Sequence, residues 1–230
     1  GKKILKRNNK AYKKLSGHLG LIPVVLISPY DTDLINAGSL ERRKFIDSII
    51  SQNNKTYLNQ LIDYNKIIQN RNKLLKNSNY NTKANLEMID VYDEELIKLS
   101  TPIHDVRKSF IDKFEPYFIE KYKQISSESE DVSISYKSDL SEKSMKDLLK
   151  DSLKKDFILQ YTSSGIHKDD LIFDIDNFSI KKFGSQGQQK SFIIALKLAQ
   201  FEYLKEKTGS SPILLMDDIF DKLDFNRVKN

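Results

Sequence analysis

The chain contains no cysteine and no tryptophan, and only five of its 230 residues are proline. The absence of cysteine excludes a disulfide-stabilised fold, thiol catalysis and zinc sites with cysteine ligands. No apolar run approaches the roughly 20 residues that a membrane-spanning helix requires, so we expect a cytoplasmic protein without a membrane partner. The 12 phenylalanines and 11 tyrosines are sufficient to fill the core of one or two domains.

Acidic residues are absent from the first part of the chain. Residues 1–30 hold seven lysines and arginines without any aspartate or glutamate, whereas the net charge of the whole chain is +6. Residues 31–230 are therefore nearly neutral, and the excess of positive charge is local. We expect any contact with the phosphates of a nucleic acid to involve this region.

Within this basic region, residues 3–14 have the pattern of a β-hairpin. Two short extended runs flank Arg-Asn-Asn-Lys at 7–10, and asparagine tolerates the positive φ angles that tight hairpin turns require. The basic side chains of the hairpin are candidates for contacts with the DNA backbone; they are Lys6, Arg7 and Lys10. Lysines on a short strand can equally well keep an exposed edge from pairing with other chains, and the sequence leaves both interpretations open.

The middle of the chain is predicted to be helical. After an apolar strand at 21–27, Ser39 is suited to cap a helix that has its apolar residues on one face. Apolar residues then recur at steps of three and four in 57–75 and in 89–110, which predicts two helices packed along a common seam. Pro102 is expected to kink or break the second helix. The pattern does not decide whether these helices form a projecting arm or part of a globular bundle.

The second half of the chain alternates strands and helices. We expect a solvated acidic loop at 126–131, followed by a strand at 132–136, a helix at 142–156, a strand at 171–178, a helix at 185–207 and a strand at 212–216. Ser185 is expected to cap the helix at 185–207 and Gly209 to end it. The last strand is apolar throughout, which predicts burial on both of its faces.

Two acids, Asp217 and Asp218, directly follow the last strand. A buried strand that ends in acids at the carboxyl edge of a sheet is the Walker B arrangement of nucleotide-hydrolysing enzymes. The first acid there binds Mg²⁺ and the second activates the attacking water. Many apolar strands end in aspartate without this function, so the hexamer alone does not distinguish the two interpretations.

A segment of small and polar residues, Gly184-Ser185-Gln186-Gly187-Gln188, precedes the long helix. The N–H groups at the start of a helix have no intrahelical partner, and together with the serine hydroxyl they form a site suited to an anion. Ordinary capping by Ser185 explains the same residues, so this segment too is ambiguous by itself.

Taken in order, these motifs resemble those of a known family. Three segments are similar to motifs of ABC-type ATPases, and among these to the RecF family. The signature segment corresponds to Ser185-x-Gly187-Gln188-Gln189, the end of the Walker B strand to Asp217-Asp218, and the D-loop to Asp221-Lys222-Leu223-Asp224. Further blocks at 25–47 and 165–170 stand in the family's order. The resemblance implies an α/β fold, a P-loop NTPase of the ABC-ATPase head type with a partial lobe I and a large helical lobe II. It assigns the end of lobe I to 1–38, lobe II to 39–207 and a return to lobe I to 208–230.

The resemblance also implies roles for these residues. In such proteins two heads sandwich ATP, and the signature segment of each contacts the γ-phosphate of the ATP on the other. Asp217 would hold Mg²⁺, and Asp218 would act as the general base. The residues implied to contact nucleotide or to lie in the D-loop at the dimer interface are Ser185, Gln186, Gly187, Gln188 and Asp224.

The function that the resemblance implies is a weak ATPase that binds DNA as an ATP-dependent homodimer. Such proteins act in recombinational repair, replication restart and the SOS response. They favour gapped or junction DNA, with its single-stranded regions, and cooperate with RecO and RecR to load RecA. In this chain, Arg42, Arg43 and Lys44 join the hairpin as candidate contacts with the DNA backbone.

The chain departs from the family pattern at several positions. It contains no G-x-x-x-x-G-K-[ST] loop, so we expect an internal piece of a longer protein that does not bind ATP well by itself. Asp218 stands where most ABC ATPases have glutamate. The residues beside His167 differ from the family's, so a structural role is expected for it, as for His18 and His104. Two alternatives stay open: another ABC-type head, of the SMC or overcoming-lysogenization kind, and a non-catalytic basic interaction module.

Overall fold

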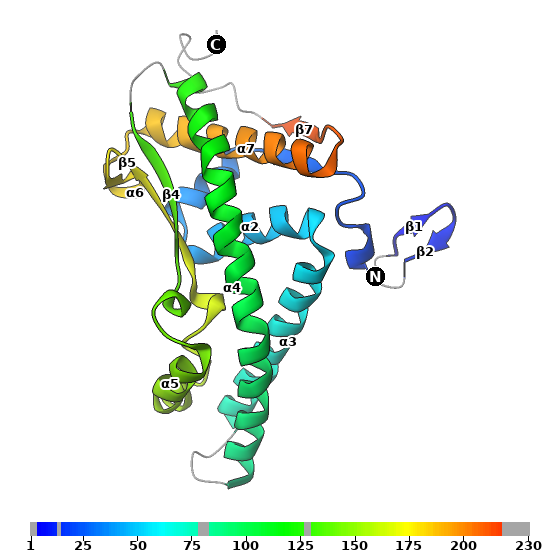
Figure 1. Ribbon diagram of the computed structural model, residues 1–230, viewed down its shortest axis with the longest axis vertical. Coiled ribbons are helices and arrows are strands. Elements are labelled where there is room, and N and C mark those ends of the chain that lie inside the picture. Colours follow the sequence, from blue (N-terminus) through cyan, green and yellow to red (C-terminus); the bar gives the residue numbers. More distant parts are fainter. Residues whose placement is uncertain (1–3, 13–14, 78–82, 127–129, 218–230) are drawn as a thin grey trace.

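The long helix α4 (Lys83–Ile125) runs through the middle of the molecule (Figure 1). The computed structural model describes residues 4–12, 15–77, 83–126 and 130–217. The other elements, in chain order, are β1 (Lys6–Arg7), β2 (Lys10–Ala11), η1 (Leu15–His18), β3 (Val24–Ile27), η2 (Pro29–Thr32), α1 (Asp33–Asn36), α2 (Ser39–Asn53), α3 (Lys55–Asn77), β4 (Val132–Lys137), η3 (Asp139–Ser141), α5 (Met145–Leu159), η4 (Ile166–Lys168), β5 (Asp170–Ile175), β6 (Phe178–Ser179), α6 (Ile180–Phe183), α7 (Gln186–Thr208) and β7 (Ile213–Met216).

Helix α4 is continuous through Pro102 and Pro116, so Pro102 does not break it. A proline inside a helix removes one hydrogen bond and leaves the carbonyl four residues earlier without its partner. These carbonyls belong to Lys98 and Asp112, which are exposed, so water can satisfy them. Packing against α3 and α7 holds the helix on both sides of the prolines.

The seam predicted between the two central helices is confirmed. Its buried residues are Tyr57, Tyr64, Ile68 and Leu75 from α3 and Ile89, Leu96, Ile103 and Phe110 from α4. Figure 1 shows this pair of helices extending away from α7 with α5 alongside, so the arm is the observed arrangement. No helix in the part of the chain that the structure describes has the length and apolar character to cross a membrane.

Aromatic side chains fill the core where α4 crosses α7. Phe110 and Phe114 of α4 stack with their ring centroids 5.1 Å apart, and Tyr203 of α7 meets both of them edge-on. Phe118 contacts Phe192 of α7, with 4.5 Å between the centroids. The spacing of four residues along α4 places its three phenylalanines on one face. This packing fixes the position of α7 and, with it, the position of the helix N-terminus.

Two small sheets flank these helices. Strands β4, β5 and β6 form an antiparallel sheet in that order, which confirms the strand predicted at 132–136. The strand predicted at 171–178 is divided between β5 and β6 by a turn at Asp176 and Asn177, both with positive φ. Strands β3 and β7 pair in parallel, with Leu26 opposite Leu215.

Strand β7 differs from the prediction, because it is not buried on both faces. Leu215 and Met216 are 48% and 51% exposed. In the described part of the chain β7 pairs with β3 alone, and the buried side chains of β3, Val25 and Ile27, face the core on one side of this sheet only. The bounds predicted for the two lobes stay a prediction.

The predicted hairpin near the start of the chain is confirmed. Strands β1 and β2 are antiparallel, with Arg7 opposite Lys10. Asn8 and Asn9 have φ angles of 49° and 63°, as the two central residues of a type I′ turn require. Both strands are exposed.

Candidate functional site

The N-terminus of α7 is capped as the sequence predicts. The Ser185 hydroxyl accepts from the N–H of Gln188 at 3.2 Å, and the Gln188 side-chain oxygen accepts from the N–H of Ser185 at 2.7 Å. This reciprocal box leaves the N–H groups of Gln186 and Gly187 outside intrahelical bonding. Ser185, Gln186 and Gly187 are exposed, so unbonded donors and the positive end of the helix dipole face solvent, where an anion can bind. At the other end, Gly209 terminates the helix with φ 67°.

Strand β7 places Asp217 at the carboxyl edge of its sheet. The N–H of Asp217 donates to the carbonyl of Ile27 at 2.9 Å, which extends the parallel pairing by one residue. The Asp217 side chain is exposed, and the described residues hold no group of three or more His, Cys, Asp or Glu that could bind a metal by itself. Mg²⁺ commonly binds one or two carboxylates and completes its shell with substrate phosphates and water, so Asp217 fits an Mg²⁺–ATP site. Asp218 and Asp224 lie outside the described residues.

The signature segment, Ser185–Gln188, and the edge of the sheet lie far apart along α7. Lys197 in the middle of the helix donates to the carbonyl of Leu26 at 3.0 Å and pairs with Asp31 at 2.6 Å. The helix between Ser185 and Lys197 is roughly 18 Å long, at about 1.5 Å per residue. Figure 1 likewise shows β7 beside the C-terminal part of α7. Within one chain, therefore, Ser185 and Asp217 do not meet at one phosphate.

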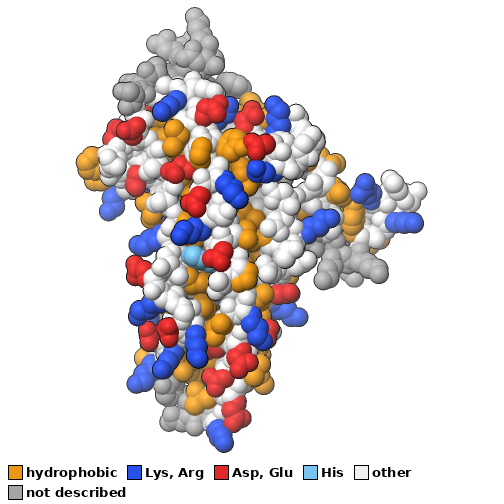
Figure 2. Space-filling model, viewed as in Figure 1, with side chains coloured by type: hydrophobic (Ala, Val, Ile, Leu, Met, Phe, Trp, Pro, Cys, Tyr) orange, Lys and Arg blue, Asp and Glu red, His pale blue; other side chains and the backbone are white. Residues whose placement is uncertain are grey.

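The two groups of basic residues predicted to contact DNA also lie apart. Lys6, Arg7 and Lys10 are exposed on the hairpin, which projects at the side of the molecule opposite β5 (Figure 1). In Figure 2 the hairpin shows basic side chains without acidic ones, whereas both signs are mixed along the helices. The N-terminal part of α2, with Arg42, Arg43 and Lys44, lies beside β5. The structure therefore offers two separate candidate surfaces.

Arg42 is held within the protein. Its Nε and Nη2 donate to the carboxylate of Asp170 at 2.6 and 3.0 Å, and its Nη1 donates to the carbonyls of Leu34 and Ala37. The side chain is 12% exposed. A guanidinium bound in this way fastens α2 to β5. A contact between Arg42 and DNA stays a prediction, and this geometry does not favour it.

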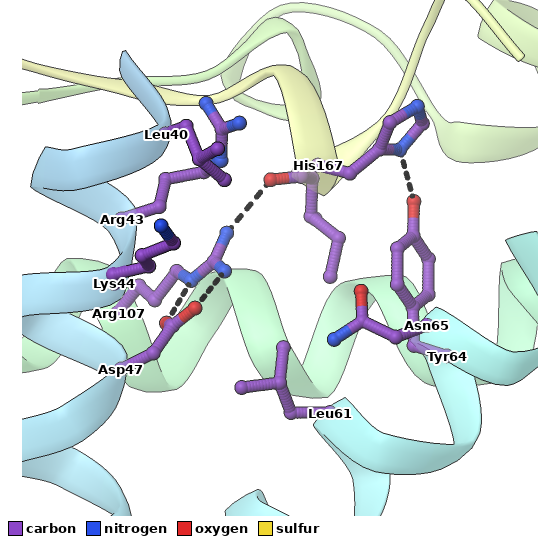
Figure 3. A pocket seen from close by; sticks show the side chains of 10 residues that line it. Leu40, Arg43, Lys44, Asp47, Leu61, Tyr64, Asn65, Arg107 and His167 are labelled. Atoms are coloured by element: carbon purple, nitrogen blue, oxygen red, sulfur yellow. Dashed lines mark hydrogen bonds and ion pairs between the residues drawn. The ribbon is translucent and has the colours of Figure 1, made fainter. Parts of the chain in front are cut away.

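Arg43 and Lys44 border a pocket of about 270 Å³ among α2, α3, α4 and η4 (Figure 3). Nη1 of Arg43 donates to the carbonyl of Asp169 at 2.6 Å. Burial and the neighbouring Arg107 guanidinium lower the pKa of Arg43. The Lys44 ammonium pairs with Glu41, but its side chain is 60% exposed. Of these three basic residues of α2, Lys44 is the one that a phosphate reaches most easily.

The floor of this pocket is a buried ionic network around Arg107 (Figure 3). Its Nε and Nη2 each donate to the carboxylate of Asp47 at 2.9 Å, and its Nη1 donates to the carbonyl of Ile166 at 2.8 Å. Nη1 also donates to the carboxylate of Asp169 at 3.1 Å. Burial raises the pKa of Asp169. These contacts join α2, α4 and η4, so the network fastens these three elements to one another.

His167 has the structural role that was expected of it. Its Nδ1 accepts from the hydroxyl of Tyr64 at 2.8 Å, and its Nε2 donates to the carbonyl of Thr162 at 2.9 Å. Burial lowers the pKa of the ring to about 4. His18 and His104 are bonded as well, to Tyr12 at 3.4 Å and Asp105 at 3.0 Å.

One residue that the sequence pattern does not indicate lies at the candidate site. Glu130 belongs to the segment expected to be a solvated loop, yet it is 9% exposed, so that expectation is wrong at this position. Its carboxylate accepts from the side-chain amide of Gln188 at 2.8 Å. An acid shortly before a strand carries no signal of burial in the sequence, because its partner stands far along the chain.

The fold places the chain in a class. No model of a protein family matches it. Two solved structures of the recombination mediator protein RecF in the RecFOR pathway, RecF-ATP and RecF-ATPrS, match with TM-scores of 0.90 and 0.89 at 32% identity. The match covers 100% and 99% of this chain and 63% of each solved chain. The chain therefore has the α/β fold of an ABC-type ATPase head.

Within that class, several curated RecF proteins match the chain. The DNA replication and repair protein RecF of Flavobacterium johnsoniae is 55% identical over 227 residues, and those of Azobacteroides pseudotrichonymphae and Parabacteroides distasonis are 49% and 46% identical over 228. Each match covers 99% of this chain and 61–63% of the relative. The chain is homologous to RecF along nearly all of its length, and it spans less than two thirds of the length of these relatives.

Proposed function

We propose that this chain is part of a RecF-type ATPase that binds DNA as an ATP-dependent homodimer in the cytoplasm, in recombinational repair and replication restart. The observation that carries the proposal is the capped, exposed N-terminus of α7 in a chain 55% identical to a DNA replication and repair protein. The RecF-ATP structure, which this fold matches, supports ATP as the nucleotide.

In the proposed dimer, the signature segment of one copy faces the nucleotide site of the other. Ser185 and the N–H groups of Gln186 and Gly187 contact the γ-phosphate in trans, while Asp217 holds Mg²⁺. The length of α7 between Ser185 and β3 supports the trans arrangement, because one chain does not bring both groups to one phosphate. Asp218 as the general base and Asp224 at the interface rest on the family resemblance.

The proposed DNA contact is with the backbone. The hairpin residues and Lys44 present positive charge to solvent, and the described residues of the hairpin include no acid that would neutralise it. Lysine and arginine on such surfaces bind phosphates without reading base sequence. Cooperation with RecO and RecR completes the proposal and is supported by the RecFOR pathway named for the matched structures. Action on gapped DNA to load RecA rests on the family resemblance.

The test is Ser185→Arg in a form of the protein that joins this chain to a G-x-x-x-x-G-K-[ST] loop. A bulky cation at the start of α7 should abolish ATP-dependent dimerisation, measured by analytical ultracentrifugation, and leave binding of ATP to the monomer unchanged. Ser211→Arg is the matched control, because Ser211 is exposed beyond the other end of α7. Unchanged dimerisation of Ser185→Arg would refute the trans contact.

Hydrolysis supplies a second measurement on the same protein. Asp218→Asn should permit dimerisation and slow ATP hydrolysis by roughly 10²–10⁴, the usual contribution of a general base. A variant that hydrolyses ATP at the normal rate would exclude Asp218 as the base.

A further inference from the structure

Glu130 is a buried carboxylate at the N-terminus of α7. It lies two residues before β4 and is 9% exposed. Glutamate is seldom buried without partners that satisfy its charge. The hydrogen-bond partners of the Glu130 carboxylate therefore show which parts of the chain it holds together.

Both carboxylate oxygens of Glu130 are hydrogen-bonded. One accepts from the hydroxyls of Tyr122, at the end of α4, and Ser126. The other accepts from Nε2 of Gln188 at 2.8 Å. Hydrogen bonds to an ionised acceptor are stronger than neutral ones, so Glu130 ties the signature segment to the end of α4.

The bond from Gln188 also fixes the orientation of its amide. An ionised carboxylate accepts hydrogen bonds and donates none, so the NH₂ group of Gln188 must face Glu130. Its oxygen then faces the N–H of Ser185, to which it is bonded at 2.7 Å. If the amide turned over, it would present donors to a donor, and the capping box would open.

We propose that Glu130 is a positioning residue for the signature segment: by orienting the Gln188 amide, it holds Ser185 and the first N–H groups of α7 in the geometry that receives a γ-phosphate. The effect of this positioning on ATP binding rests on the function proposed above. The structural part of the proposal, the ordering of Ser185–Gln188 by Glu130, does not depend on nucleotide.

The structural part is tested by hydrogen exchange in this chain. Glu130→Ala should speed exchange of the Ser185 amide by about fivefold, the equivalent of one hydrogen bond. Glu130→Gln should restore protection, because its oxygen can still accept from Gln188 while its NH₂ donates to the oxygen of Tyr122.

Glu115→Ala is the matched control. Glu115 is a glutamate of α4 that accepts from the backbone N–H of Ile134 at 3.0 Å. Its removal should speed exchange at Ile134 and leave Ser185 unchanged. The inference is overturned if Glu130→Ala leaves Ser185 protected, or if Glu115→Ala exposes Ser185 to the same extent.

The nucleotide part is tested by dimerisation with ATP in the longer form that carries the phosphate-binding loop. Glu130→Ala should weaken the dimer about fivefold or more, and Glu130→Gln should match the unmodified protein. If Ser185→Arg blocks dimerisation but Glu130→Ala does not, the inference fails while the proposed function stands. If Ser185→Arg has no effect, the proposed function fails, whatever the exchange data show.

Discussion

Arginine is rare in this chain, and its positions are informative. Only six of the 38 basic residues are arginine. Four of them, Arg42, Arg43, Arg71 and Arg107, donate from their guanidinium groups to acceptors far away along the chain. A planar guanidinium binds several acceptors at once in fixed directions, which an ammonium group does not. At these four positions, arginine therefore makes long-range bonds that need this geometry.

The pair formed by Arg71 and Asp156 gives a prediction of stability. Both side chains are 0% exposed, and the charged atoms are 2.7 Å apart. Asp156→Ala leaves the guanidinium buried without one of its carboxylates, so we expect a loss of about 3–5 kcal/mol in the free energy of unfolding, measured with urea. Asp151→Ala is the control, because Asp151 forms an exposed pair with Lys143 and its loss should cost at most about 1 kcal/mol. Equal losses would contradict the prediction.

His167 gives a prediction of pH dependence. Burial lowers the pKa of the ring from 6.5 to about 4, so the unfolded chain takes up a proton at a higher pH than the folded chain does. The stability that the neutral ring contributes is complete above pH 6.5 and is lost as the pH falls towards 4. The loss is about 3 kcal/mol, from roughly 1.4 kcal/mol for each unit of pKa shift.

His167→Gln should remove this component, because glutamine can accept from Tyr64 and donate to Thr162 without titrating. Urea unfolding at several pH values should give a stability that falls less steeply for the variant between pH 6.5 and 4. Parallel curves for the two proteins would show that His167 does not contribute the pH dependence.

At the scale of elements, Gly20 fixes how the chain enters β3 beside the end of α2. Its φ is +81°, and a Cβ atom there would lie 1.8 Å from the backbone oxygen of Gln52. Gly20→Ala should therefore reduce the free energy of unfolding by about 2–4 kcal/mol. Gly38→Ala is the control, since a Cβ atom at Gly38 meets nothing within 4 Å, and its effect should stay within about 1 kcal/mol. Thermal unfolding of the two variants distinguishes backbone collision from the general effect of adding a methyl group.

Elements that depend on local pattern are predicted well from this sequence. The spacing of apolar residues gives the seam of α3 and α4, and Ser185 and Gly209 give both ends of α7. Paired asparagines give the hairpin turn. In each case the residues that decide the structure lie within a few turns of one another, so a short window of sequence contains the cause.

Features that depend on distant partners are not predicted. The burial of β7 depends on which strands cover it, and the continuity of α4 through Pro102 depends on packing against other helices. The candidate site shows the same limit, because Glu130 meets Gln188 and Lys197 meets Asp31 only after folding. Local sequence thus predicts the capped end of α7 but not the contacts that hold it in place.

At the scale of the whole molecule, the charge is divided unevenly. The helical part carries both signs side by side, whereas the described part of the hairpin is basic only (Figure 2). We therefore expect the triple variant Lys6→Ala, Arg7→Ala, Lys10→Ala to weaken binding to gapped duplex DNA. If the three residues bind phosphates, the slope of log K against log salt should become less steep, its magnitude falling by about 0.9 for each phosphate that the variant no longer neutralises. Fluorescence anisotropy at several salt concentrations measures both quantities.

A control that removes the same charge elsewhere decides whether the hairpin itself binds the DNA. Lys146, Lys150 and Lys154 are exposed at intervals of four on α5, so their triple alanine variant removes three charges from one helical face. If DNA is attracted only by net charge, both triple variants show the same decrease in affinity and in salt slope. If the hairpin touches the backbone, its variant alone changes the slope, because counterion release depends on the phosphates that the protein neutralises directly rather than on charge at a distance. If the two triple variants have equal salt slopes, the hairpin lysines do not bind the DNA backbone, and their role is to keep an exposed strand edge from pairing with other chains.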